Sequence, residues 1–191
     1  MSYLWSFQSF DAEKLVSLFS DPDGPAMSRL LDLVQSEISG FRDAEAATSV
    51  ARAFVASGLS YDDLSERQAR DADDLIVLIF SPEGFAEDLD VAYLSDEGFH
   101  PADVKELLAR NPTAAVLPAL VRGRRAGQDQ PMECEYCFLS PGEVASVIDE
   151  VRAAIDAPAP WSEEWARANA EGNLLQPLAS AGDRWVLGQL G

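Results

Sequence analysis

The chain has 191 residues, of which 47% are hydrophobic and 25% are charged, and this balance excludes a disordered chain. The length is typical of one domain that buries a sizeable core. Its 33 acidic residues outnumber 14 basic ones, and the net charge of −19 argues against nucleic acid or an anionic membrane surface as the partner.

The N-terminal segment predicts a strand followed by a short helix. Aromatic residues alternate over residues 2–10, with Tyr3, Trp5 and Phe7 on one face, which is typical of a strand. Asp11 is then expected to cap a short amphipathic helix. The Pro- and Gly-rich residues 21–25 predict a break after it.

The following region predicts three further helices. Apolar residues recur at helical spacing in two segments that we expect to end at Gly40 and Gly58. Ser60 is expected to cap another helix, with acidic residues in its first turn. Residues 71–80 fit either a buried strand or the end of a buried helix, because so short an apolar run does not separate the two.

The middle of the chain predicts a loop, a helix and a strand before a well-marked helix start. Residues 81–100 are expected to be mainly loop, and residues 101–111 to form a helix. Residues 132–139 predict a strand. Ser140 and Glu143 then form the pattern of a capping box, with a proline in the first turn of the helix that follows.

The C-terminal region predicts helices over residues 161–170 and 174–181 and a final strand over residues 185–189. Strands and helices are interspersed without a regular βαβ order. The expected fold is therefore α+β, a mostly helical single domain over residues 1–191 with a small mixed or antiparallel sheet.

Three segments resemble the YfbM-like family of uncharacterised bacterial proteins. They are the aromatic strand and first helix (residues 3–16), the strand that runs into the Ser-Pro-Gly-Glu helix start (residues 136–144) and the closing helix, glycine turn and strand (residues 174–187). The resemblance implies a compact α+β domain and a helix over residues 71–80. The family's typical Trp and His in that helix are replaced here by acids, and the resemblance implies no activity.

The Cys134-Glu-Tyr-Cys137 motif is the most conspicuous candidate metal site. A zinc site needs three or four protein ligands, and the chain supplies two Cys and one His, so carboxylates or a second subunit would have to complete it. In a strand the two thiols would point to opposite faces. We expect two structural thiols, with zinc shared across a dimer as the alternative.

His100 is the only histidine, so any nucleophile–histidine pair would have to use it. It precedes Pro101 at a helix start, where we expect it to lie in the turn. Two acidic clusters are candidate sites for a divalent cation, although a solvated face is the favoured interpretation of both. They are Asp71, Asp73 and Asp74, and Glu87, Asp88 and Asp90.

Three arginines, Arg122, Arg124 and Arg125, form the only basic cluster, in a loop expected to be exposed over residues 122–131. The glycines beside them would let the loop bind a phosphate group. No phosphate-binding glycine motif is present, and we favour a surface loop that balances nearby acids.

Trp161 and Trp165 are four residues apart and would share one face of the predicted helix. If exposed, they would form a binding anchor, because Trp is enriched at interface hot spots. If buried, they would belong to the core, which is the favoured interpretation.

These observations favour a non-enzymatic protein–protein interaction module, of an immunity-like or antitoxin-like kind, whose acidic surface meets a basic partner. The alternative is a small-ligand binder or a metal-assisted enzyme that uses a carboxylate cluster. We expect no cofactor. The absence of a long apolar segment and of a signal peptide predicts a cytoplasmic location. The preference for Arg over Lys and the abundance of Ala suggest a bacterial source.

Overall fold

The computed structural model describes residues 4–21, 23–36, 44–57, 60–95, 97–126, 128, 131, 133–163 and 165–191. The chain forms two compact units. Residues 1–10 and 92–191 make up the sheet unit, and residues 11–91 make up the helical unit. The predicted α+β class, mostly helical with a small sheet, is confirmed. The boundary of a single domain over residues 1–191 stays a prediction.

The sheet unit is built on a four-stranded antiparallel sheet in the order β2-β1-β4-β3. The N-terminal and C-terminal strands are neighbours at its centre and pair along their whole length, from Trp5 opposite Leu190 to Phe10 opposite Trp185. The strands are β1 (Trp5–Phe10), β2 (Ala92–Tyr93), β3 (Tyr136–Leu139) and β4 (Trp185–Leu190).

The core of the sheet unit begins at the aromatic face of β1. Trp5 and Phe7 are fully buried, and the glycine opposite Phe7, Gly188, leaves room for their rings. The indole N–H of Trp5 donates to the carbonyl of Leu120 at 2.5 Å, so its one polar atom is satisfied inside the core.

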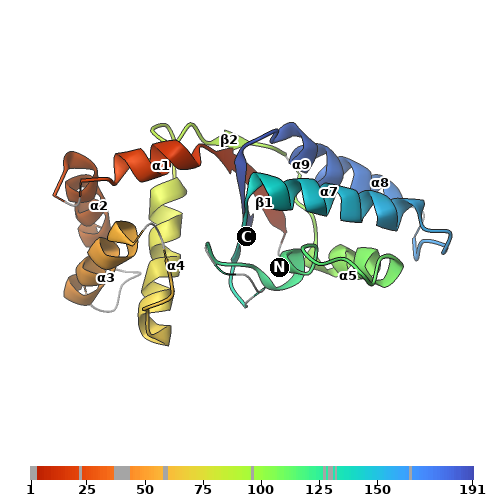
Figure 1. Ribbon diagram of the computed structural model, residues 1–191, viewed down its shortest axis with the longest axis horizontal. Helices are drawn as coiled ribbons and strands as arrows, with labels where there is room; N and C mark the ends of the chain where they lie inside the picture. Colours follow the sequence, from red (N-terminus) through yellow and green to blue (C-terminus); the bar gives the residue numbers. More distant parts are fainter. Residues whose placement is uncertain are drawn as a thin grey trace. The chain divides into compact units, whose positions relative to one another are not determined.

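Helices of the sheet unit bury this aromatic face (Figure 1). The longest, α7, presents a buried stripe of Val144, Val147 and Val151 to it. The helical elements are α5 (Pro101–Arg110), α6 (Ala119–Arg122), α7 (Pro141–Asp156), α8 (Ala166–Ala170), the π-helical turn η1 (Glu171–Leu175) and α9 (Gln176–Ser180). The last three follow one another without a break.

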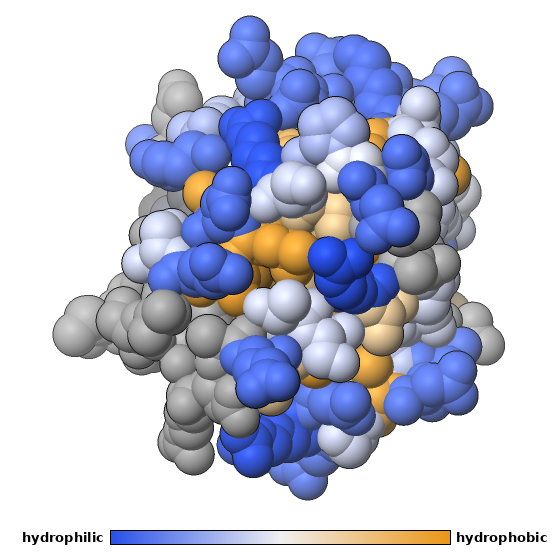
Figure 2. Space-filling model, turned by 90° about the vertical axis from the view of Figure 1, so that its left-hand side faces the viewer, coloured by the Kyte–Doolittle hydropathy of each residue, from blue (hydrophilic) through white to orange (hydrophobic). Residues whose placement is uncertain are grey.

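The helical unit contains α1 (Ala12–Leu18), α2 (Pro25–Ser36), α3 (Ala44–Ala56) and α4 (Glu66–Phe80). As predicted, the Asp11 side chain caps α1 by accepting from the N–H groups of Glu13 and Lys14. Figure 2 shows the side of α2 and α3, where hydrophilic side chains surround a smaller apolar area. Among the described helices, none combines the length and the apolar character that crossing a bilayer requires.

The ambiguous residues 71–80 are helical and form most of α4. The predicted cap of this region was wrong, because α4 begins after Ser65 and not after Ser60. Ser65 and Gln68 form a capping box, whereas the Ser60 hydroxyl accepts from the N–H of Asp62 in a turn. The predicted helix ends at Gly40 and Gly58 lie outside the described residues.

The predictions for the sheet unit are largely confirmed, with two corrections. Ser140 and Glu143 form the expected capping box at the start of α7. The predicted strand over 132–139 begins only at Tyr136, while Met132 lies outside the described residues. The helix predicted from Trp161 begins only at Ala166, because Ser162 and Glu163 form a bend and Trp165 lies in a turn.

Candidate functional site

The two cysteines occupy different surroundings. Cys137 lies in β3 and is fully buried, and this burial, followed by the proximity of Cys134, raises the pKa of its thiol well above the usual range. Cys134 precedes the strand, is half-buried, and donates its thiol hydrogen to the carbonyl of Tyr136 at 3.1 Å. The prediction that both cysteines lie in one strand was wrong. Among the described residues, no three His, Cys, Asp or Glu side chains are grouped so as to hold a metal ion.

Residues 122–126, called here the arginine loop, lie against the segment that carries the two cysteines. The Arg122 carbonyl accepts from the N–H of Cys134 at 2.9 Å, and Arg124 forms a parallel bridge with Cys137. These contacts require the left-handed backbone of Gly123, with φ of 81°, where a Cβ atom would lie 2.1 Å from the Cys134 carbonyl oxygen. The loop is therefore a structured part of the sheet edge.

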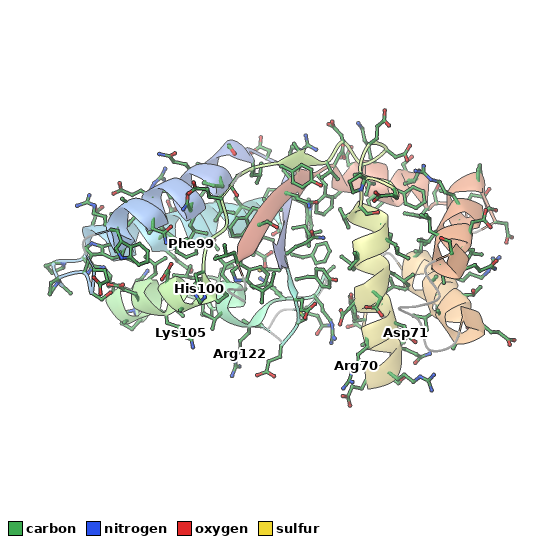
Figure 3. The ribbon with its side chains drawn as sticks, turned by 180° about the vertical axis from the view of Figure 1, so that it is seen from behind. Arg70, Asp71, Phe99, His100, Lys105 and Arg122 are labelled. Atoms are coloured by element: carbon green, nitrogen blue, oxygen red, sulfur yellow. The ribbon has the colours of Figure 1, made fainter. Side chains whose placement is uncertain are left out.

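The three arginines differ in their exposure. Arg124 was predicted in an exposed loop, but only 12% of its side chain is exposed, and its guanidinium lies 2.5 Å from the Glu143 carboxylate. Glu143 also accepts from the backbone N–H of Ser140, so it joins the arginine loop to the start of α7. Arg125 is half-buried. Arg122 is exposed and projects from the ribbon (Figure 3).

His100 caps α5, as its place beside Pro101 suggested. Its Nδ1 atom accepts from the N–H of Ala102 at 2.9 Å, so this nitrogen serves the helix start. Figure 3 shows it between Phe99 and the first turn of α5. The neighbouring carboxyl, Asp103, has a raised pKa, caused first by burial and opposed by His100 and by a hydrogen bond from Asn169.

A chain of side-chain hydrogen bonds extends from α5 to the π-helical turn. The Asn169 amide donates to Asp103 at 2.8 Å, and the Asn173 amide donates to the Asn169 oxygen at 2.8 Å. A π-helical turn often marks a functional position in a helix. The half-buried carboxyl of Asp103 and the two amides form a polar cluster that sequence spacing alone does not reveal.

The two predicted acidic clusters are partly occupied by internal contacts. The guanidinium of Arg29 lies 3.0 Å from Asp88, and Lys14 lies 3.9 Å from Asp90. On α4, the Tyr61 hydroxyl donates to Asp73 at 3.1 Å. Asp71 lies on the same helix beside Arg70 (Figure 3). The contacts of Asp73, Asp88 and Asp90 are therefore with side chains of the same unit, and the favoured interpretation of both clusters as a solvated face stays a prediction.

Trp161 and Trp165 do not share a helix face, which corrects the prediction. Trp161 lies in the turn before α8, half-buried against the core, with the guanidinium of Arg110 4.0 Å from its ring centre. Trp165 lies at the start of α8 and is 55% exposed. The core interpretation therefore fits Trp161, and the exposed interpretation fits Trp165.

Two residues that sequence reasoning missed hold this region in place. Arg110 donates to the carbonyls of Ala154, Ala157 and Ala159 at the end of α7. Glu106 accepts from the backbone N–H and the hydroxyl of Ser162, at 2.7 and 2.6 Å. Both residues lie on α5. Their contacts with residues 154–162 were not predicted, because the two segments are far apart in the sequence.

Glu150 is a third residue whose role was not predicted. Its carboxylate accepts from three consecutive backbone N–H groups, those of Ala115, Val116 and Leu117, at 2.7–3.2 Å. This arrangement resembles an anion bound to a backbone nest, with the anion supplied by the chain itself. The nest is thus occupied from within the unit and is not a site for an external phosphate.

Comparisons with protein-family models, with curated proteins and with solved structures find no match for this chain. The resemblance of three segments to the YfbM-like family therefore stays a prediction. The geometry described above is what any functional proposal has to rest on.

Proposed function

We propose that the chain is a non-enzymatic interaction module whose acidic surface binds a basic protein. One observation carries this proposal. Among the described residues, Gln8 and Ser9 are the buried ones in the polar or charged class, so none of the described acidic residues is buried. With 33 acidic and 14 basic residues in the sequence, such a surface attracts cationic partners and accelerates their association.

The candidate catalytic, metal-binding and phosphate-binding side chains make contacts within the fold, which supports the same proposal. The Nδ1 atom of His100 caps a helix, Cys137 is fully buried, and Arg124 is paired with Glu143. An immunity-like or antitoxin-like protein, which binds a basic partner in the cytoplasm, is the concrete form that we propose. The sequence offers no disulfide framework of the kind that small secreted domains use, which favours this compartment.

Salt dependence tests the proposal directly. We expect the immobilised full chain to retain a protein of high isoelectric point from the cytoplasmic extract at low ionic strength and to release it as salt is added. Screening shortens the range of the electrostatic attraction to about 8 Å near 0.15 M salt. Recovery of no partner, or of a partner whose affinity is independent of salt, would contradict the proposal.

A small-ligand site is the alternative function, and the polar cluster of Asp103, Asn169 and Asn173 is the observation that favours it. A ligand that binds there stabilises the folded chain by mass action. A thermal-shift screen that raises the melting temperature of the wild-type chain, but not of Asn169→Ala, would favour this alternative over the interaction module.

A further inference from the structure

We propose that Trp165 and the carboxylates around it are the docking surface for an arginine- or lysine-rich segment of the partner. This inference rests on the proposed function and assigns it a place on the molecule. We define the Trp165 surface as Trp165 with the exposed acids Asp156 and Glu163 and the half-buried acid Glu171.

Hydrogen bonds and a ring contact hold the described residues on both sides of Trp165. Ser162, which lies three residues before Trp165, donates its backbone N–H and its hydroxyl to Glu106, and Trp161 stacks on Arg110. On the other side, the carbonyl of Trp165 accepts from the N–H of Asn169 at 2.9 Å. Binding to such a segment costs little ordering of the backbone, which favours affinity.

The charged residues near Trp165 determine which kind of partner segment is favoured there. Arg167 is paired with Glu171 at 2.9 Å, and the pKa of Arg167 is raised by that hydrogen bond and by the negative charges of Glu171 and Asp156. Glu163 is exposed two residues before Trp165. Between residues 156 and 171 the sequence has four acidic residues and one basic residue, Arg167, which favours a cationic partner segment over an acidic one.

The exposed indole of Trp165 also favours a cationic partner segment. Its ring face attracts guanidinium and ammonium groups within about 6 Å, and Trp is enriched among the residues that dominate interface energies. The stacking of Arg110 on Trp161 at 4.0 Å shows the same interaction inside this segment. Trp165 offers a second indole of this kind, 55% exposed, to a guanidinium from outside.

The test uses a fluorescent twelve-residue peptide of alternating Arg and Leu, with Glu in place of Arg in a control peptide, and measures anisotropy on the full chain. We expect Trp165→Ala to weaken binding of the basic peptide by about tenfold or more. Glu163→Lys is expected to weaken it as well. Tyr93→Ala is the matched control, because Tyr93 is 62% exposed on β2 of the same unit, and it is expected to leave binding unchanged.

The outcomes separate the docking surface from the proposed function. If Trp165→Ala and Tyr93→Ala both bind like the wild-type chain, and salt weakens all three, the docking surface is wrong while the proposed function stands. If the wild-type chain does not bind the basic peptide, or binds it independently of salt, both are wrong. If Trp165→Ala converts a wild-type dimer into a monomer in sedimentation experiments, the occupant is a second copy of the chain and the inference is overturned.

Discussion

The arginine loop and the tryptophan segment, which carries Trp161 and Trp165, were both candidate binding elements, although a surface loop and the core were the favoured interpretations. In each, one residue is used by the fold and a second is left exposed: Arg124 is paired and Arg122 exposed, while Trp161 is stacked and Trp165 exposed. The exposed residues differ in what they offer. An exposed arginine offsets part of the acidic surface, whereas an exposed tryptophan among carboxylates adds an anchor to it.

The two regions also differ in how they are held. Backbone hydrogen bonds to the segment before and within β3 fix the arginine loop, and the conformation of Gly123 makes them possible. Side chains of α5 fix the tryptophan segment. Substitutions that remove the backbone contacts of the arginine loop, or the side-chain contacts of the tryptophan segment, therefore test whether the two regions are stabilised independently.

The largest effect is expected for Gly123→Ala. The added Cβ atom meets the carbonyl oxygens of Cys134 and Tyr136 at 2.1 and 2.6 Å, at a φ that favours glycine. We expect the free energy of unfolding to fall by about 3 kcal/mol or more. Chemical denaturation measures this, with Gly142→Ala as the control, since its Cβ meets no atom within 4 Å. Equal stability of both variants would contradict the assigned loop conformation.

A comparable effect in the tryptophan segment is expected for Arg110→Ala. The substitution removes the hydrogen bonds of Arg110 to the carbonyls of Ala154, Ala157 and Ala159, and it removes the stack on Trp161. We expect a loss of about 2–3 kcal/mol in urea denaturation. Arg152→Ala is the control, because its pair with Asp149 is exposed, and it is expected to cost under about 0.5 kcal/mol. A small loss for Arg110→Ala would mean that the segment is held by other contacts.

A smaller effect is expected for Arg124→Met, which keeps the length of the side chain and removes its charge. The Glu143 carboxylate, 28% exposed, then loses its partner, and we expect a cost of about 1–2 kcal/mol. Arg70→Met is the control, because it breaks a pair with Glu66 whose side chains are 74% and 85% exposed, and surface pairs contribute little.

A double-mutant cycle with Glu143→Gln isolates the coupling between Arg124 and Glu143. A coupling near zero would show that the backbone contacts alone hold the arginine loop. The same cycle on Arg70 and Glu66 gives the value expected for an exposed pair.

The smallest effect concerns the pH dependence contributed by Asp103, which joins α5 to α8. Because its pKa is raised in the folded chain, the folded state binds the proton more strongly than the unfolded state does. Its contribution to stability is therefore greatest at acidic pH and declines as the pH rises from the unfolded value near 3.8 through the folded one. Comparison of wild type with Asp103→Asn over pH 3–7 should show this slope. A slope of opposite sign would mean that the hydrogen bond from Asn169 dominates over burial.

The sequence predicted those elements that depend on contacts between residues close together in the chain. The capping box of Ser140 and Glu143 predicted the start of α7, and the alternation of Trp5 and Phe7 predicted strand β1. The cap was predicted at Ser60, whereas Ser65 caps α4 through its reciprocal bonds with Gln68. The candidate site was harder to predict, since its restraints join residues far apart in the sequence, 49 positions for Arg110 with Ala159 and 56 for Glu106 with Ser162.

The π-helical turn acts as an angular correction in the helical path from Ala166 to Ser180. Four residues of an α-helix advance about 40° beyond a full turn, so residues spaced by four drift around its surface. A wider π-helical turn reverses part of that drift. Ala166, Ala170, Leu174 and Leu178 are all buried at this spacing. Because this turn holds about one residue more than an α-helical turn, deleting one residue within 171–175 would restore a regular α-helix and leave Leu178 facing the core.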